Sequence, residues 1–453
     1  MTQVFALHSA YGLATAVAAL DEGVLGESDD RLLVTIDSAR VPETVVGIGV
    51  DPTLQSLRGR FDRIEDLGAL LGPLHPNEWR PSDADLPMLE KLLTRVWGID
   101  PDDVELFVQS PQIAPARTLM SIFPLARITV VGDGLMTYSP MRVALGRSVA
   151  ARIGQVVYAD VVPEVHPLVG GTTATPRPIP AAALQRVLRE TDDGDPVTDS
   201  AGAVLDDDVP TVLVLGQYLS ALGLLTIQEE ATLHRDLIDQ AMRWSPRRVV
   251  FKPHPAAPPL QNDVVRDRAL SHGVEFAEYR GALSAEVLAE RIGATAVVAV
   301  FSTAVPTARA ALGLAIGSAG TAELLTALTA FENNNRVPIV IVDALTREAS
   351  PYADPARLQL LIDAVGYVMQ PENAAHLRPR AEAFLREAAP AERDRYFTPE
   401  RLSALRLPGA PVEAWLRRMR RGSGGVGRVE RWRLTAVGVR NRARRAWREI
   451  RGR

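Results

Sequence analysis

Hydrophobic and polar positions alternate along the first half of the chain in a way that predicts strands followed by helices. Short β-branched and apolar runs predict buried strands at residues 3–7, 31–36, 104–108 and 126–131. The apolar spacing of residues 11–20 predicts a helix, and a second helix is expected between the last two strands. Strands and helices that alternate at this spacing form βαβ units around a parallel sheet, whose ligands bind at the carboxyl ends of the strands.

The second half of the chain repeats this alternation after a polar segment rich in turn residues. Residues 191–210 have little apolar periodicity, so we place a linker there. Apolar runs then predict strands at residues 211–215, 248–251, 296–300 and 338–342. A capping-box pattern, Thr226 with Glu229, predicts the start of a helix that extends to about residue 244.

These elements predict an α/β protein with two doubly wound, Rossmann-like domains that face a cleft. The first domain is expected at residues 1–190 and the second at residues 211–395. Helical patterns at 377–385 and 399–405 lead into a basic, helical C-terminal extension, residues 396–453. Two such domains around a cleft make the arrangement called GT-B, although a fold of this kind does not by itself decide a function.

Composition excludes several classes of protein. Of 453 residues, 47% are hydrophobic and 23% are charged, which is the balance of a folded chain rather than a disordered one. The absence of cysteine excludes disulfides, thiolate nucleophiles and cysteine metal sites. The sequence contains neither a signal-peptide pattern nor an apolar run long enough to span a bilayer, so we expect a cytoplasmic protein.

The net charge of −5 conceals an arginine-rich end. Residues 417–453 carry fourteen arginines and two glutamates, whereas residues 1–416 are strongly acidic. Trp432 and Trp447 lie among these arginines, a composition typical of a helix on the surface of an anionic membrane. Docking on an acidic partner or on the acidic body of the chain is an alternative. Binding of nucleic acid is a third alternative, which the acidic body disfavours.

One motif predicts an imidazole at the edge of the second sheet. The sequence Lys252-Pro253-His254-Pro255 follows the strand expected at 248–251, and the two prolines restrict the backbone on either side of the histidine. An imidazole placed there can bind a phosphate or donate a proton to a phosphate leaving group. The alternative is a turn histidine that bonds its own backbone.

Two further strand ends carry polar side chains. Ser302 and Thr303 follow the strand expected at 296–300, where hydroxyls and backbone N–H groups form either an anion site or an ordinary helix cap. In the first domain, Asp133 lies between Gly132 and Gly134 after a strand. It is either part of a plain turn or a carboxylate that faces the imidazole across the cleft, in which case the two groups form a base and acid pair.

Taken together, these motifs resemble the bacterial sialyltransferase and polysialyltransferase superfamily. The order and approximate spacing of the motifs agree, and the similarity extends over about residues 1–390, including 215–219 and 283–288. The resemblance implies a GT-B glycosyltransferase that transfers sialic acid from CMP-sialic acid to a glycan acceptor with inversion. It also implies a role in polysaccharide synthesis at the cell surface, such as capsule synthesis, with no metal and no cofactor.

The resemblance implies a role for each motif. Asp133 would be the general base on the acceptor hydroxyl, and His254 would protonate or stabilise the departing phosphate of CMP. The residues implied in donor binding are Lys252, Pro255, Glu286, Ser302 and Thr303. The family pattern has two acids before the glycine, whereas this chain has Gly132 at the first position, so Asp133 is either the base or a positioning residue.

Two other functions stay open at this point. A GT-B transferase that uses another activated sugar or an activated polyol would also need a phosphate site at Lys252 to Pro255. A non-catalytic nucleotide-binding or scaffold protein of a surface-glycan complex would need no catalytic base. The pair Asp83 and Asp85 resembles a metal-binding Asp-x-Asp, but its polar surroundings favour a helix start instead.

Overall fold

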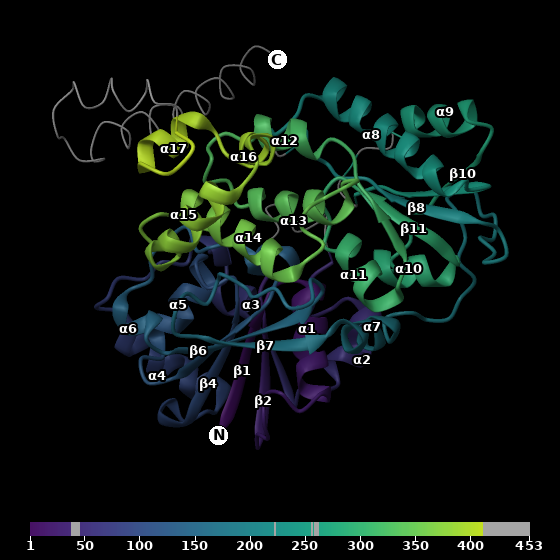
Figure 1. Cartoon of the computed structure of the whole chain (residues 1–453). Coiled ribbons are helices and arrows are strands. Elements are labelled where there is room, and N and C mark those ends of the chain that lie inside the picture. Colours follow the sequence, from purple (N-terminus) through teal and green to yellow (C-terminus); the bar gives the residue numbers. More distant parts are fainter. Residues whose placement is uncertain (38–45, 222, 255–256, 258–261, 411–453) are drawn as a thin grey trace, which may run out of the picture.

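Two sheets of parallel strands form the framework of the protein, which we describe from a computed structural model over residues 1–37, 46–221, 223–254, 257 and 262–410 (Figure 1). The first sheet has the strand order β3-β2-β1-β4-β5-β6-β7, and each neighbouring pair is parallel. Its strands are β1 (Thr2–Leu7), β2 (Asp30–Thr35), β3 (Arg63–Asp66), β4 (Val104–Gln109), β5 (Arg127–Val131), β6 (Ile153–Asp160) and β7 (Thr175–Pro180).

The second sheet has the order β10-β9-β8-β11-β12 and is also parallel. Its strands are β8 (Thr211–Leu215), β9 (Arg248–Lys252), β10 (Glu275–Glu278), β11 (Ala294–Ala299) and β12 (Ala315–Gly317). Two parallel sheets covered by helices confirm the predicted α/β class with two Rossmann-like domains in the GT-B arrangement. The strands predicted from the sequence are found within two residues of their expected bounds, with one exception described below.

Helices cover both sheets and form the C-terminal part of the described chain (Figure 1). The helices of the first half are α1 (Ala10–Asp21), α2 (Gln55–Arg58), α3 (Leu67–Leu71), α4 (Leu86–Trp97), α5 (Ala114–Ile122), α6 (Arg147–Ala150) and α7 (Ala181–Arg189). Those of the second half are α8 (Ile227–Ala241), α9 (Asp263–Ser271), α10 (Ala285–Arg291), α11 (Ala304–Leu312), α12 (Thr321–Ala327), α13 (Arg336–Thr346), α14 (Pro355–Met369), α15 (Arg378–Glu387), α16 (Pro390–Tyr396) and α17 (Pro399–Leu405). The capping box predicted before α8 is present, with Thr226 and Glu229 bonded to each other's backbone N–H.

The strand predicted at residues 338–342 is wrong, because this run lies inside helix α13. Residues 336–344 are all buried, so the helix has no polar face toward solvent. The run 338–342 is apolar at every position and so lacks the 3.6-residue pattern that separates helices from strands in a sequence. The β-branched Ile and Val residues of this run then favoured a strand on composition alone.

The two domains contact each other through helices beside the linker. Helix α7 of the first domain packs against α10 and α11 of the second. Two ion pairs reinforce this contact: Arg189 binds Glu290 at 2.5 Å, and Arg291 binds Asp192 at the start of the linker. Residues 190–210 then lead from α7 to β8, the first strand of the second sheet.

The C-terminal helices return to the first domain. The backbone N–H of His166 donates to Gln359 Oε1 on α14 at 2.6 Å, and Asn373 Nδ2 donates to the carbonyl of Met141 at 2.8 Å. Gly366 on α14 lies so close to Leu168 that a Cβ there would be 2.4 Å from Leu168 Cδ1. Residues from the last third of the described chain therefore cover part of the first domain.

A buried carboxylate holds these helices together. Asp343 on α13, with 1% of its surface exposed, accepts hydrogen bonds from Thr321 Oγ1 at 2.6 Å, Tyr396 Oη at 2.6 Å and Arg395 Nε at 2.7 Å. Burial raises the pKa of a carboxyl, but these donors outweigh burial and hold the pKa of Asp343 below its usual range.

None of the helices in the described ranges has the length and hydrophobicity needed to cross a bilayer.

Candidate active site

Three neighbouring strands of the first sheet end in polar residues. The pairing of β1 with β4 places Ala6 beside Val108, and the pairing of β4 with β5 places Gln109 beside Val131. The residues that follow these strands therefore form one row at the carboxyl edge of the sheet: His8, Ser110 and the Gly132-Asp133 pair. Parallel sheets bind their ligands at this edge.

The structure explains why glycine stands at position 132. The N–H of Gly132 donates to the carbonyl of Val157 at 2.7 Å, so this residue continues the strand pairing. A Cβ at Gly132 would lie 2.8 Å from Tyr158 Cβ and 3.1 Å from Tyr158 Cα, which leaves no room for an acidic side chain unless the backbone shifts. The half-buried Asp133 is therefore the carboxylate that this motif presents.

Two segments elsewhere in the chain, Asp21-Glu22-Gly23 and Asp192-Asp193-Gly194, match the acid-acid-glycine pattern better than Gly132-Asp133-Gly134, but both serve structural roles. Asp21 is the last residue of α1, and Gly23 after it has the left-handed φ of +68° that is common where a helix ends. Asp192 is bound by Arg291 in the contact between the domains. Neither segment follows a strand.

The motifs of the two domains meet directly. The N–H of Leu135, which follows Gly134 in the 3₁₀ turn η5 (Gly134–Tyr138), donates to Thr303 Oγ1 at 3.1 Å. Gly134 has a φ of +54°, and a Cβ there would lie 2.3 Å from the same Oγ1 atom. Thr303 precedes α11 but makes no side-chain cap of that helix. Its hydroxyl instead binds the opposite domain, while Ser302 Oγ accepts the N–H of Ala304 at 3.2 Å.

Gln217 fixes the position of this hydroxyl pair within the second sheet. Its Nε2 donates to the carbonyl of Phe301 at 2.7 Å, and its Oε1 accepts the N–H of Phe301 at 2.9 Å. These two hydrogen bonds connect the segments that follow β8 and β11 and hold the segment that carries Ser302 in place. Residues 215–219 contributed to the family resemblance, but the sequence did not predict this role.

His254 lies where the sequence predicted it, directly after β9. His254 is exposed to solvent on one side. The residues packed around it partly desolvate the ring and so lower its pKa, while the charge of Glu230 acts in the opposite direction. Glu230 itself is buried and accepts the N–H groups of Leu219 and Ser220 at 2.6 Å and 3.1 Å. The neutral form of the His254 ring, which both donates and accepts a hydrogen bond, is thereby favoured. Pro255 lies outside the described residues.

Lys252 and Glu286 form a second charged group of the predicted donor side. Lys252 Nζ donates to the carbonyl of Gly281 at 3.2 Å and lies 5.0 Å from the centre of the Tyr279 ring. Burial lowers the pKa of Lys252 to about 8, while the charge of Glu286 acts in the opposite direction. Glu286 is buried in the first turn of α10, and its burial raises its pKa.

Two residues that the sequence did not single out connect these groups. The buried hydroxyl of Tyr11 on α1 lies near Thr307, and its pKa is raised by burial and by the charges of Glu286 and Asp133. Tyr11 is therefore close to an acid of each domain. His8 stands at the end of β1, beside Ser110 and near Asp133. The rule that identified His254, a polar residue directly after a strand, also applies to His8.

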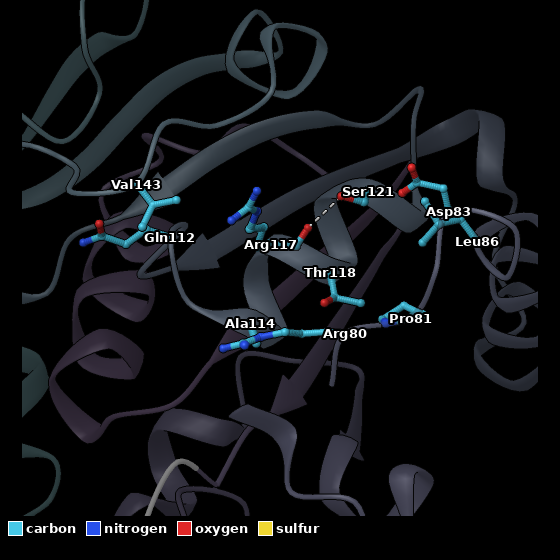
Figure 2. Close-up of a pocket in the computed structure, with 10 residues that line it drawn as sticks. All are labelled: Arg80, Pro81, Asp83, Leu86, Gln112, Ala114, Arg117, Thr118, Ser121 and Val143. Carbon is cyan, nitrogen blue, oxygen red and sulfur yellow. Dashed lines mark hydrogen bonds between the residues drawn. The ribbon is translucent and has the colours of Figure 1, made fainter. Parts of the chain in front are cut away.

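A pocket of about 540 Å³ opens on the first domain along α5 (Figure 2). Arg117, Thr118 and Ser121 line it from α5, and Arg80 and Asp83 line it from the segment before α4. In the part of the chain that the structure describes, neither Arg80 nor Arg117 forms a salt bridge. The pocket therefore offers two guanidinium groups to an anionic ligand.

The Asp-x-Asp segment beside this pocket begins a helix, as the sequence predicted. Asp85 Oδ2 accepts the N–H and the hydroxyl of Ser82 at 3.1 Å and 2.7 Å, and α4 starts at the next residue. Within the described ranges, no group of three or more His, Cys, Asp or Glu residues is placed to hold a metal ion.

Comparisons with known proteins point to one family. A family model of alpha-2,8-polysialyltransferases matches residues 3–314, well over half of the chain. A search of curated protein sequences gave no match.

Several solved structures are similar to this chain at low sequence identity. The GT-B domain of a sialyltransferase from Photobacterium damselae is 12% identical, with 76% of this chain and 96% of that chain covered and a TM-score of 0.36. A UDP-GlcNAc 2-epimerase from Neisseria meningitidis is 11% identical, with 85% and 98% covered and a TM-score of 0.39. An O-GlcNAc transferase from Thermobaculum terrenum is 14% identical, with 86% and 69% covered and a TM-score of 0.35.

Proposed function

Because the chain belongs to the alpha-2,8-polysialyltransferase family and is thus a glycosyltransferase, we propose that it transfers sialic acid from CMP-sialic acid to a glycan acceptor, with inversion and without a metal ion. One observation carries the proposal: the N–H of Leu135 binds Thr303 Oγ1 at 3.1 Å, so the acid motif of one domain meets the hydroxyl motif of the other. A base and a phosphate site on opposite walls can hold acceptor and donor against each other in the geometry of attack.

On the acceptor side, Asp133 takes part as the base. As the acceptor oxygen attacks the anomeric carbon of the donor, its O–H bond breaks and the carboxylate accepts the proton. A new C–O bond forms on one face of the sugar while the bond to the phosphate of CMP breaks on the other. This single displacement inverts the anomeric centre.

On the donor side, the leaving phosphate is stabilised by hydrogen-bond donors and one cation. Ser302, Thr303 and the neutral ring of His254 supply donors, and Lys252 supplies a positive charge below about pH 8. A monophosphate leaving group carries less charge than a diphosphate, so such donors can serve in place of a metal ion. Glu286 is proposed to bind the ribose, and Pro255 to restrict the backbone beside His254.

The experiment that tests this proposal follows CMP release from CMP-sialic acid, with and without a panel of sialylated and galactosylated acceptors and with and without EDTA. We expect acceptor-dependent release that EDTA does not change, and a loss of at least about 100-fold in His254→Ala, the range for losing a hydrogen-bond donor to the charge that develops in the transition state. His75→Ala is the matched control, because His75 also precedes a proline but lies before the 3₁₀ turn Pro76–Glu78 of the first domain. It should retain full turnover.

The other outcomes identify the alternatives. Consumption of a different activated sugar or polyol, with CMP-sialic acid left intact, would make the protein another kind of GT-B transferase. Binding of CMP without consumption of any donor would make it a non-catalytic nucleotide-binding protein.

For the acceptor, we propose that the pocket along α5 binds a carboxylate of a sialylated glycan through Arg80 and Arg117. Arg117→Ala should then raise the KM for sialylated acceptors about tenfold, because a charge-assisted hydrogen bond contributes roughly 1.5 kcal/mol. The KM for CMP-sialic acid should not change. An equal rise in both constants would contradict this placement.

We also propose that the arginine-rich residues 417–453, which lie outside the described residues, attach the enzyme to the inner face of the cell membrane, where surface polysaccharides such as capsules are made. The support is the excess of arginine interleaved with tryptophan. A chain that ends at residue 416 should keep its transfer activity and lose its sedimentation with vesicles that contain phosphatidylglycerol. Unchanged sedimentation would favour docking of this segment on the protein itself.

A further inference from the structure

The first-domain edge that holds Asp133 contains a second proton acceptor, His8. His8 Nε2 lies 3.1 Å from Ser110 Oγ, and the register of β4 with β5 brings Gly132, the residue before Asp133, beside Ser110 in the row formed by the ends of β1, β4 and β5. At position 132, where the family pattern has a further acid, a side chain would clash with Tyr158 unless the backbone shifts. The proton-accepting groups that this row offers are therefore the imidazole and one carboxylate.

The structure fixes His8 through its backbone. Gln109, with 1% of its surface exposed, accepts the N–H groups of His8 and Ser9 on one amide oxygen at 3.0 Å and 3.3 Å. The amide nitrogen of Gln109 donates to Ser9 Oγ at 2.6 Å. Gly12 leaves the space for this amide, because a Cβ there would lie 2.4 Å from Gln109 Oε1. The backbone of His8 is thus held from the adjacent strand β4.

Ser110 is held in an unusual conformation to make its contact with His8. Its φ of +52° lies in the left-handed region, which costs a residue with a Cβ roughly 1 kcal/mol. This conformation occurs where β4 ends and beside the imidazole. A hydroxyl held in this way can keep one ring nitrogen engaged and so fix the orientation of the ring.

We propose that His8 and Asp133 act as one proton-accepting dyad, so that the proton removed from the acceptor hydroxyl is shared by the imidazole and the carboxylate. This inference rests on the proposed function and assigns a catalytic role to a residue outside the family motifs. The acceptor O–H bond breaks, the proton is taken up by the dyad, and it leaves to water after the transfer. A carboxylate beside an imidazole stabilises the cation that forms on the ring.

The charges around His8 agree with this role. Burial lowers the pKa of His8, which keeps the ring neutral and able to accept a proton, and the charge of Asp133 raises it. Two hydroxyl groups from neighbouring elements also face this edge, that of Ser110 after β4 and that of Tyr11 on α1. Burial raises the pKa of Tyr11 above its usual range, so this hydroxyl stays protonated. Glu286 acts on Tyr11 from the second domain.

The test compares His8→Gln, Asp133→Asn and the double variant in the CMP-release assay across pH. We expect His8→Gln to lower kcat about 10- to 100-fold, within the range of acid–base catalysis, with the KM for CMP-sialic acid unchanged. The acid limb of kcat should move to lower pH, because a carboxylate alone titrates below an imidazole. The double variant should be little worse than Asp133→Asn, because the two groups act as a unit.

A surface pair provides the matched control. His272 Nε2 lies 2.7 Å from Asp239 Oδ1 outside the site, so His272→Gln removes an imidazole that lies beside a carboxylate and should change neither kcat nor the pH profile. An unchanged acid limb and kcat in His8→Gln, with an active wild-type enzyme, would overturn the dyad and leave the proposed function intact. A wild-type protein that consumes no CMP-sialic acid would overturn the proposed function itself.

Discussion

The contact between Gly134 and Thr303 makes one substitution informative about both domains at once. In Gly134→Ala, the new Cβ would stand 2.3 Å from Thr303 Oγ1 and 2.8 Å from Thr303 Cγ2, well inside ordinary contact. Thr303 would have to move away, and its hydrogen bond from the N–H of Leu135 would be lost. The two motifs that we propose to act together would then be separated.

The magnitude has two parts. Alanine at a φ of +54° costs about 1 kcal/mol, and the lost hydrogen bond costs about 1 kcal/mol more. Gly23→Ala is the matched control for the first part, because Gly23 has a φ of +68° and nothing within 4 Å of its added Cβ. We therefore expect both variants to lower the free energy of unfolding, Gly134→Ala by about 1 kcal/mol more than Gly23→Ala.

The assay is acceptor-dependent CMP release together with thermal unfolding. Gly23→Ala should keep wild-type kcat, whereas Gly134→Ala should lose at least about tenfold, the equivalent of about 1.4 kcal/mol in the transition state. In a Thr303→Ala background, which removes both nearest atoms, Gly134→Ala should cause a much smaller further loss. Equal kcat in Gly134→Ala and Gly23→Ala would refute the reasoning that this contact assembles the site.

Three further predictions concern charge and packing. The KM for the donor should rise as the pH increases through about 8, where Lys252 loses its proton. Lys252→Arg should remove this pH dependence because a guanidinium stays charged. A wild-type KM that does not change with pH would contradict this prediction. Asp343→Asn should lower the free energy of unfolding in urea by about 3 to 5 kcal/mol, because Arg395 loses its buried partner, and a loss below about 1 kcal/mol would be inconsistent with that network. Gly132→Asp should lower stability without raising kcat, because its Cβ meets Tyr158; a more active variant would show that the backbone adapts.

The sequence predicted those parts of the fold and the site that depend on local pattern. Strand ends can be read from β-branched runs, so His254, Asp133 and the pair Ser302 and Thr303 were expected at sheet edges, and the structure places them there. Strand β7 could not be predicted in this way, because only one of its residues, Ile179, is buried.

The remaining features depend on contacts between distant residues. The side chain of Gln217 binds the backbone of Phe301 across 84 positions, and the side chains of His8 and Ser110 meet across 102 positions. No local spacing indicates such pairs, because the strand order that joins them is a property of the whole sheet. For the same reason, the sequence could describe Thr303 as a helix cap or an anion site but not as a bond to the other domain. The role of Pro255 and that of the arginine-rich segment stay predictions.

The return of the last helices to the first domain has a mechanical consequence. The chain passes between the domains once through residues 190–210 and again when α14 reaches the first domain, where Gln359 binds His166 and Asn373 binds Met141. Two domains connected at two points can move relative to each other by a hinge motion about one axis, whereas free rotation about a single linker is prevented. It also follows that a first domain without the C-terminal helices would expose the surface of Leu168 that Gly366 covers.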